Sequence, residues 1–290
     1  MAFSARAEAL VSLPPRQRMR ARRRLSPRLL AHLPWPDRQA LVAATRLLLA
    51  GVMASGATSA HADTVLVAVA ANFAGTLAEL GPGFTAASGH QLAIAAGSSA
   101  RLATQIEAGA PFQVLLSADQ ATPRALAAKG LAQADTQFTY AVGRLALWSA
   151  RPGRVDSQGA VLANPSIRHL AIANPKLAPY GAAAMAVLAA RGLDTALAPR
   201  LVMAESVAQA YQFVATGNAE LGFVALSQLM GPGKTPSGST WIVPQTLYPL
   251  LRQDAVLLTP GRAKPAALAW LAYLKTPAAL ALIQSHGYGP

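Results

Sequence analysis

The strongest constraint in this sequence is a repeated order of apolar run, polar turn and helical stretch. In the first unit, the run 65–70 (VLVAVA) ends at a turn around Asn72, and apolar residues then recur at helical spacing from 73 to 84. Further apolar runs lie at 92–96, 114–116, 145–148, 170–173, 201–204 and 221–225. Short strands that alternate with helices predict an α/β fold whose sheets are mostly parallel.

The charge of the chain is concentrated at its N-terminus. The 290 residues carry 25 Lys and Arg against 12 Asp and Glu, a formal net charge of +13. The first 62 residues hold ten arginines and two acidic residues, a net +8, and the other 228 hold 15 basic and 10 acidic residues, a net +5. With 53% hydrophobic residues overall, a body of this size can bury a substantial core, and no nucleic-acid partner is expected for it.

The N-terminal 62 residues have the order of a secretory signal. An apolar run at 47–54 (LLLAGVMA) follows Arg46, and Ala60-His61-Ala62 supplies the small-x-small pattern of a cleavage site. The run is too short to span a membrane. We therefore expect a signal core at about 42–62, cleavage after Ala62, and export. Residues 1–40 either follow from a start codon assigned too early, which we favour, or form a basic arm that contacts nucleic acid or lipid.

Residues suited to catalysis are sparse after residue 62. The chain has no cysteine, which excludes disulfides, thiolate metal sites and cysteine nucleophiles. The histidines at 90, 169 and 286 are widely spaced, so neither metal ligands nor a cofactor are expected. Gly97-Ser98-Ser99 has some likeness to a nucleophile elbow, but the sequence offers it no partner base. We expect no enzyme activity and keep an exported serine hydrolase, with Ser98 or Ser99 as nucleophile, as an alternative.

Four strand-to-helix junctions place small or capping residues where a helix is expected to begin. A helix start leaves backbone N–H groups unpaired and carries partial positive charge, so it is suited to binding an anion. Asn and Ser are also ordinary N-caps, and capping alone would explain any one junction. Four of them, at the carboxyl ends of parallel strands, favour a shared anion site. The junctions are Ala71-Asn72, Ser98-Ser99, Pro179-Tyr180-Gly181 and Ser206-Val207.

At these junctions the sequence resembles the periplasmic molybdate-binding proteins of ABC importers. The likeness runs over essentially all of residues 64–289. It implies an α/β fold of the two-lobed type II periplasmic binding protein class, in which each lobe is a mostly parallel sheet flanked by helices and the ligand cleft lies between the lobes. The motifs that carry it are Ala70-Ala71-Asn72-Phe73, Gly97-Ser98-Ser99, Gln105-Ile106-Glu107-Ala108-Gly109-Ala110-Pro111, Leu116-Ser117-Ala118-Asp119, Ala178-Pro179-Tyr180-Gly181, Glu205-Ser206-Val207 and Leu221-Gly222-Phe223-Val224-Ala225.

The resemblance also implies which residues hold the ligand, molybdate or tungstate. In that family a tetrahedral oxyanion is bound by neutral groups, so molybdenum is expected as its oxyanion and without direct protein ligands to the metal. The matching positions are Ala71, Asn72, Ser99, Tyr180 and Val207. The resemblance implies backbone N–H donation from Asn72, Tyr180 and Val207, and both N–H and hydroxyl donation from Ser99.

Two positions depart from the family pattern. Close relatives often carry Thr where this chain has Ala71, and another branch places a Tyr hydroxyl at the position of Ala225. Both side-chain hydroxyls are absent here, so only the backbone of Ala71 is left to bind. The choice among molybdate, tungstate and sulfate depends on the radius of the cavity and stays open at this point.

The resemblance sets further expectations for organisation and partners. Lobe I is expected at 63–141 and 246–290 and lobe II at 142–245, joined by two crossing strands that act as a hinge. The expected partner is an ABC permease of the inner membrane, to which a monomeric periplasmic protein delivers its ion. A sulfate, thiosulfate or tungstate-selective binding protein of the same fold is the alternative.

Overall fold

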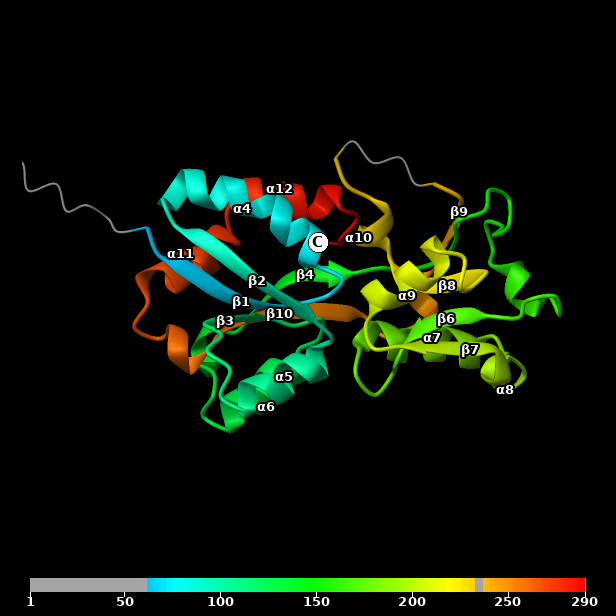
Figure 1. Cartoon of the computed structure of the whole chain (residues 1–290), viewed down its shortest axis with the longest axis horizontal. Coiled ribbons are helices and arrows are strands. Elements are labelled where there is room, and N and C mark those ends of the chain that lie inside the picture. Colours follow the sequence, from blue (N-terminus) through cyan, green and yellow to red (C-terminus); the bar gives the residue numbers. More distant parts are fainter. Residues whose placement is uncertain (1–61, 233–236, 290) are drawn as a thin grey trace, which may run out of the picture. The chain divides into compact units, whose positions relative to one another are not determined.

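The computed structural model of the protein describes residues 62–232 and 237–289. The basic prefix and the expected signal core lie outside these residues, and so does the cleavage motif apart from Ala62. The described residues form two five-stranded sheets, each covered by helices (Figure 1). The α/β class expected from the alternating pattern is therefore confirmed.

The first sheet is formed by β1 (Thr64–Ala70), β2 (Gln91–Gly97), β3 (Val114–Leu116), β4 (Phe138–Gly143) and β10 (Leu251–Leu257). Their order in the sheet is β2-β1-β3-β10-β4. β1 pairs in parallel with β2 and β3, whereas β10 pairs antiparallel with β3 and β4. Four strands therefore share one direction, and β10 runs against them.

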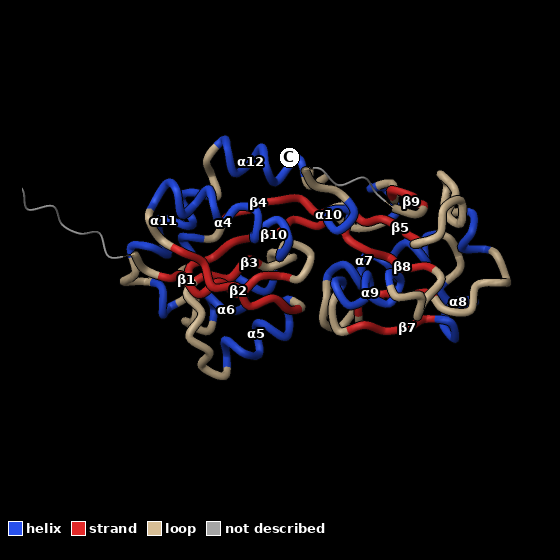
Figure 2. The backbone as a smooth tube through the Cα atoms, turned by 45° about the horizontal axis from the view of Figure 1, so that its top comes forward, coloured by secondary structure: helices blue, strands red, loops and turns tan. Residues whose placement is uncertain are grey.

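Helices cover both faces of the first sheet (Figure 2). On one face lie α4 (Ala74–Ser88), α11 (Pro265–Tyr273) and α12 (Pro277–Ser285), and on the other lie α5 (Ser99–Glu107) and α6 (Ala121–Ala128). The sequence of β1 explains this arrangement, because successive side chains of a strand point to opposite faces. Val65, Val67 and Val69 pack with α4 and α11, whereas Ala68 packs with Leu102 of α5.

The second sheet repeats this plan. Its strands are β5 (Leu145–Ser149), β6 (Leu170–Ala173), β7 (Leu201–Ala204), β8 (Leu221–Ala225) and β9 (Ser239–Ile242), in the order β7-β6-β8-β5-β9. β6 is parallel to β7 and β8, and β5 is antiparallel to β8 and β9. Its helices are α7 (Pro179–Ala190), α8 (Asp194–Leu197), α9 (Val207–Ala215) and α10 (Leu226–Leu229). Ile172 of β6 packs with Val187 of α7, and the adjacent Ala171 packs with Ala210 of α9, so α7 and α9 cover opposite faces.

The chain passes between the two sheets twice. It leaves β4 at Gly143 to enter β5, and it returns through residues 243–250 from β9 to β10. The strands β4 and β10 pair with each other, and so do β5 and β9, so the two connections together join neighbouring strands of one sheet to neighbouring strands of the other. The lobe limits expected from the sequence stay a prediction. Short 3-10 helices lie at Ala134–Thr136, Ala160–Ala163, Ala198–Arg200, Gln245–Leu247 and Thr259–Gly261.

The apolar pattern of the sequence does not predict β10. Its sequence is LRQDAVL, and the polar residues Gln253 and Asp254 in its middle are both buried. These polar residues interrupt the apolar run by which the other strands are recognised in the sequence. Their burial is stabilised by hydrogen bonds rather than by apolar contacts. The C-terminal helices α11 and α12 are separate elements, and α12 is capped by Thr276 Oγ1, which accepts from Ala279 N.

Helix length and hydropathy bear on membrane insertion. Taken one by one, the helices of the described residues are all too short or too polar to cross a membrane. Only α11 and α12 together, as a pair bent by 61°, meet the criterion of length and composition.

Gly181 marks a close approach of α7 to β6. A Cβ on Gly181 would lie 2.1 Å from the backbone oxygen of Ala173, and a sheet carbonyl cannot move without disturbing its neighbours. We expect Gly181→Ala to lower the free energy of unfolding by about 1–3 kcal/mol through overpacking, as measured by urea unfolding. Gly75→Ala in α4 is the control, because nothing lies within 4 Å of the new Cβ, and it should be neutral or stabilising. A Gly181→Ala variant as stable as the wild type would contradict this close packing.

Candidate anion-binding site

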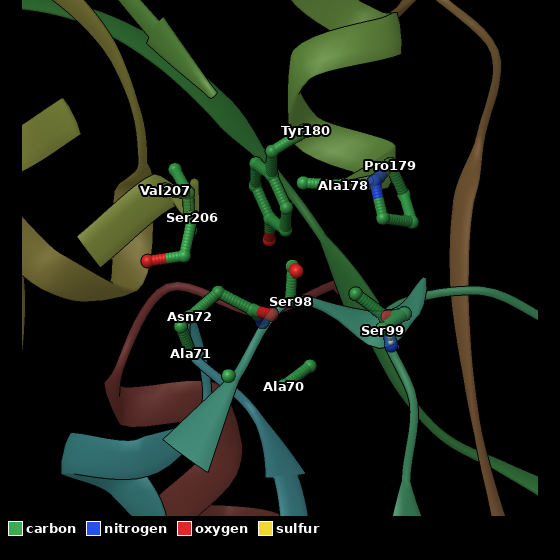
Figure 3. Close-up of a pocket in the computed structure, with 12 residues that line it drawn as sticks. Ala70, Ala71, Asn72, Ser98, Ser99, Ala178, Pro179, Tyr180, Ser206 and Val207 are labelled. Carbon is green, nitrogen blue, oxygen red and sulfur yellow. Dashed lines mark hydrogen bonds between the residues drawn. The ribbon is translucent and has the colours of Figure 1, made fainter. Parts of the chain in front are cut away.

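The carboxyl ends of strands from both sheets meet at one cavity (Figure 3). The turns after β1, β2 and β3 contribute from the first sheet, and the starts of α7 and α9 contribute from the second. All five residues expected to bind the ligand line this cavity, and Ala225 does not. Their role as ligands stays a prediction. The lining residues are Ala70, Ala71, Asn72, Gly97, Ser98, Ser99, Ala118, Ala178, Pro179, Tyr180, Ser206 and Val207.

The cavity is small and its walls are uncharged. It offers about 10 Å³ to the centre of a water-sized sphere, which is about the space that one water molecule needs. None of its lining side chains is charged. Asn72, Ser99, Tyr180 and Val207 are each at most 4% exposed. An anion held here would be screened from water and bound by dipoles rather than by a counter-charge.

Helix starts bring free backbone N–H groups to the cavity. Ser99 and Val207 are the first residues of α5 and α9, and Tyr180 is the second residue of α7, after Pro179. The first N–H groups of a helix have no partner within the helix. Among the described residues, the amides of these three and of Asn72 donate to no protein acceptor. Together with the helix dipoles, they give the cavity a positive potential without a charged side chain.

Ala71 differs from the other four expected ligand residues. Its backbone N–H donates to the carbonyl of Gly97 at 2.9 Å and is therefore engaged within the protein. Its side chain has no polar atom. Ala71 thus forms part of the cavity wall. Its backbone was expected to bind the ligand, but its N–H is not free to donate to one.

Asn72 is held by hydrogen bonds to buried side chains. Its Nδ2 donates to Gln253 Oε1 at 2.9 Å and to Tyr288 Oη at 3.1 Å. Its carbonyl oxygen accepts from Ser227 Oγ and from Tyr288 Oη, both at 2.9 Å. Because both protons of the side-chain amide are engaged, the backbone N–H of Asn72 is the donor that remains for a ligand.

Gln253 links this turn to the second sheet. It lies on β10 and is fully buried. Its Oε1 accepts from Asn72 Nδ2 and from Tyr140 Oη, the latter at 3.0 Å, and its Nε2 donates to Tyr180 Oη at 3.1 Å. The contact needs the glycine at position 143, because a Cβ there would lie 2.3 Å from Tyr180 Oη and 2.5 Å from Gln253 Nε2. One amide therefore connects the turn after β1 with the start of α7.

Burial keeps the tyrosines of this network protonated. It raises the pKa of Tyr140 and of Tyr180 well above the ordinary value of 10.0, and the proximity of Tyr288 adds to both effects. Burial likewise raises the pKa of Tyr288. The three phenols therefore stay neutral at physiological pH, and no negative charge develops beside the cavity.

The two serines of the turn after β2 differ in their bonding. Ser99 Oγ accepts from the backbone N–H of Ala118 at 3.1 Å, which leaves its own proton free to donate. Ser98 Oγ is buried and has no hydrogen-bond partner among the described residues. Sequence reasoning names the Ser98-Ser99 junction, takes Ser99 alone of the two as a ligand, and does not identify Gln253. Nothing local in the sequence tells which hydroxyl the fold engages, and Gln253 lies in a strand that the pattern does not predict.

Charged side chains lie at the mouth of the cavity. Arg101 of α5 and Glu205, which follows β7, form an ion pair with Nη1 and Oε2 2.5 Å apart. Both side chains are more than half exposed, and pairs of this kind contribute about 0–1 kcal/mol. They line a surface hollow together with Ser98 and Ser206. Their charges cancel, so the potential of the cavity comes mainly from the backbone.

The cavity does not have the parts of a hydrolytic site. Its lining contains no His, Lys, Asp or Glu to act as a base toward Ser98 or Ser99. Across residues 62–232 and 237–289, His, Cys, Asp and Glu side chains nowhere gather in threes to hold a metal ion. The groups assembled here are hydrogen-bond donors, which are suited to a ligand made of acceptors.

Known proteins share this fold and much of the sequence. A family model described as bacterial extracellular solute-binding protein matches residues 65–289. The chain belongs to this family. Two molybdate-binding proteins ModA are similar to it: that of Azotobacter vinelandii is 53% identical over 233 residues (80% of this chain and 92% of the relative), and that of Rhodobacter capsulatus is 50% identical over 232 residues (80% and 90%).

A solved structure supports the same relationship. The periplasmic molybdate-binding protein of Azotobacter vinelandii matches with a TM-score of 0.76 at 42% identity, covering 78% of this chain and 99% of that one. The binding-protein fold and the family resemblance inferred from the junction motifs are thus confirmed.

Replacing Gln253 tests the link between the sheets. Gln253→Met keeps the side-chain volume but leaves Asn72 Nδ2 and two tyrosine hydroxyls short of a buried partner. We expect the free energy of unfolding to fall by at least about 2 kcal/mol, because each buried group left unpaired costs about 1–3 kcal/mol. Gln105→Met, at an exposed position, is the control and should change stability by less than about 0.5 kcal/mol. Equal stabilities in urea unfolding would rule out a structural role for the network.

The raised tyrosine pKa values predict a loss of stability in alkali. The unfolded chain releases its phenolic protons near pH 10, while Tyr140, Tyr180 and Tyr288 hold theirs in the folded protein. Above pH 10 the folded state binds more protons than the unfolded state, so the free energy of unfolding should decrease with rising pH. Urea unfolding between pH 8 and 11 measures this, and Tyr140→Phe should show a shallower decrease. A pH-independent stability across that range would contradict the assignment.

Proposed function

We propose that this protein captures molybdate, and also tungstate, in the periplasm and delivers it as a monomer to an ABC permease of the inner membrane. The observation that carries the proposal is the convergence of four unengaged backbone N–H groups on one small cavity whose lining side chains are uncharged. The similar proteins of Azotobacter vinelandii and Rhodobacter capsulatus are molybdate-binding proteins, which supports the same ligand class here. Export through the signal that ends at Ala62 is part of this proposal.

Neutral donors are well suited to a dianion. Burying a counter-charge has a desolvation cost that can exceed the Coulombic gain, whereas amides fixed at helix starts are already oriented. A hydrogen bond to a charged group contributes about 1.5–3 kcal/mol. The amides of Asn72, Ser99, Tyr180 and Val207, together with the Ser99 hydroxyl, then provide enough for tight binding after the cost of association.

The same donors set the selectivity among anions. In a cavity lined by donors, the O–H of a protonated oxyanion would face another donor, so phosphate near neutral pH is disfavoured. Sulfate, molybdate and tungstate carry no such proton. Among these three, the separation of the opposing donors decides which ion fits, and the link through Gln253 holds that separation.

A ligand panel tests the proposal directly. Isothermal titration of the purified protein with molybdate, tungstate, sulfate and phosphate should show tight binding of the first two, weaker binding of sulfate and no heat with phosphate. Tight binding of sulfate alone would favour the sulfate-binding alternative. No heat with any of the four would remove the proposed function.

Val207 allows a test of backbone donation by itself. As the first residue of α9, it can be replaced by proline, which is tolerated at that position and has no N–H. The preceding Ser206 already has the extended backbone (φ −146°, ψ 165°) that proline requires. We expect Val207→Pro to weaken molybdate binding by about tenfold or more, because one hydrogen bond to a charged group is lost. Val207→Ala keeps the N–H and is the matched control; if the two variants bound equally well, the amide of Val207 would not be a ligand.

A further inference from the structure

Ser98 occupies a capping position without capping its helix. It is the N-cap residue of α5, with extended backbone angles (φ −72°, ψ 150°), but its side chain makes no cap hydrogen bond. Ser206 holds the same position before α9, and its Oγ accepts from Gln209 N at 3.3 Å. Two N-cap serines therefore face the same cavity, and only one of them is used by its own helix.

The hydroxyl of Ser98 is also buried without compensation. Ser98 is 4% exposed, and its Oγ has no hydrogen-bond partner among the described residues. Leaving a buried hydroxyl unpaired costs free energy, so such a group in a native protein calls for an explanation, such as a role in binding. Other buried atoms without a partner, such as Trp270 Nε1 and His286 Nδ1, do not line the cavity, whereas Ser98 does.

The hydroxyl of Ser98 bonds to none of the polar groups around it in the described residues. Figure 3 shows its hydroxyl directed into the space between Asn72 and Tyr180. The oxygen of Tyr180 already accepts from Gln253 Nε2, and the hydroxyl of Ser99 is held by Ala118 N. Ser98 also lines the hollow at the mouth, beside Arg101 and Glu205. Ser98 therefore lines both the cavity and the hollow at its mouth.

We infer that Ser98 Oγ donates a hydrogen bond to the bound oxyanion and is a binding residue in addition to the four amides and Ser99. This inference rests on the proposed function, since it takes the ligand to be a fully deprotonated oxyanion. Such an ion has only acceptors, and the Ser98 proton is free to turn toward one of them. Binding then supplies the partner that the ligand-free protein lacks, so the hydroxyl favours the liganded state.

The inference predicts opposite effects on binding and on stability. Ser98→Ala should weaken molybdate binding about 10- to 100-fold in isothermal titration, the range expected for one hydrogen bond to a charged group. In the absence of ligand, the same variant should be as stable as the wild type or more stable, because it removes an unpaired buried hydroxyl. Ser98→Gly, which keeps a favourable N-cap residue, should lose affinity to the same extent.

Ser206→Ala is the matched control. It removes an N-cap hydroxyl from the same cavity, but one that is engaged with Gln209 N. It should lower the stability of the ligand-free protein and weaken molybdate binding less than Ser98→Ala does.

Two results would decide against Ser98. Wild-type affinity in either Ser98 variant would overturn the inference, and so would a loss of ligand-free stability in Ser98→Ala, which would indicate a structural hydroxyl. If the wild type bound no molybdate, the proposed function would fail first, and that failure is distinguishable because it needs no variant.

Discussion

The buried amide of Gln253 is the interaction on which the geometry of the site depends. An oxyanion can be held from two sides only if the donors of both sheets keep a fixed separation. Gln253 provides both an acceptor and a donor, so one side chain bonds Asn72 on one sheet and Tyr180 on the other. It lies on β10, which runs against its neighbours and has an irregularity in its pairing with β4 between Gln253 and Asp254. Asp254 accepts instead from Gln120, Gln137 and Thr139.

The cavity lining has no charged side chain, and backbone amides supply its hydrogen-bond donors. Each strand that ends at the cavity leads into a turn or helix whose first amides lack an intrahelical partner. Those amides are oriented before any ligand arrives, so they add attraction without rearrangement. The ion pair of Arg101 and Glu205 is exposed at the mouth, where both charges stay hydrated and have no large desolvation cost. The protein thus separates its full charges from its ligand donors.

Local patterns in the sequence were sufficient for the fold class and the family. The alternation in runs such as 65–70 reflects which strand face meets which helix, and the capping residues Ser98 and Ser206 mark the starts of α5 and α9. Both signals depend only on residues close in the sequence, so they can be recognised without the tertiary structure. Gln253 could not be found in this way, because this polar residue interrupts the apolar pattern by which its strand, β10, would be recognised. The sequence likewise does not show that the amide of Ala71 is engaged, since this depends on its contact with the carbonyl of Gly97.

The sequence by itself determined the alternating strands and helices, the positions where helices begin, and hence which residues were candidates for binding an anion. The tertiary structure decided which of these donors are free. Ser98 and Ser206 are the same residue type at the same helix position, yet one hydroxyl caps a helix and the other lies unpaired in the cavity. The physical reason is that a hydrogen bond is a property of two groups in space, and a sequence pattern specifies only one of them.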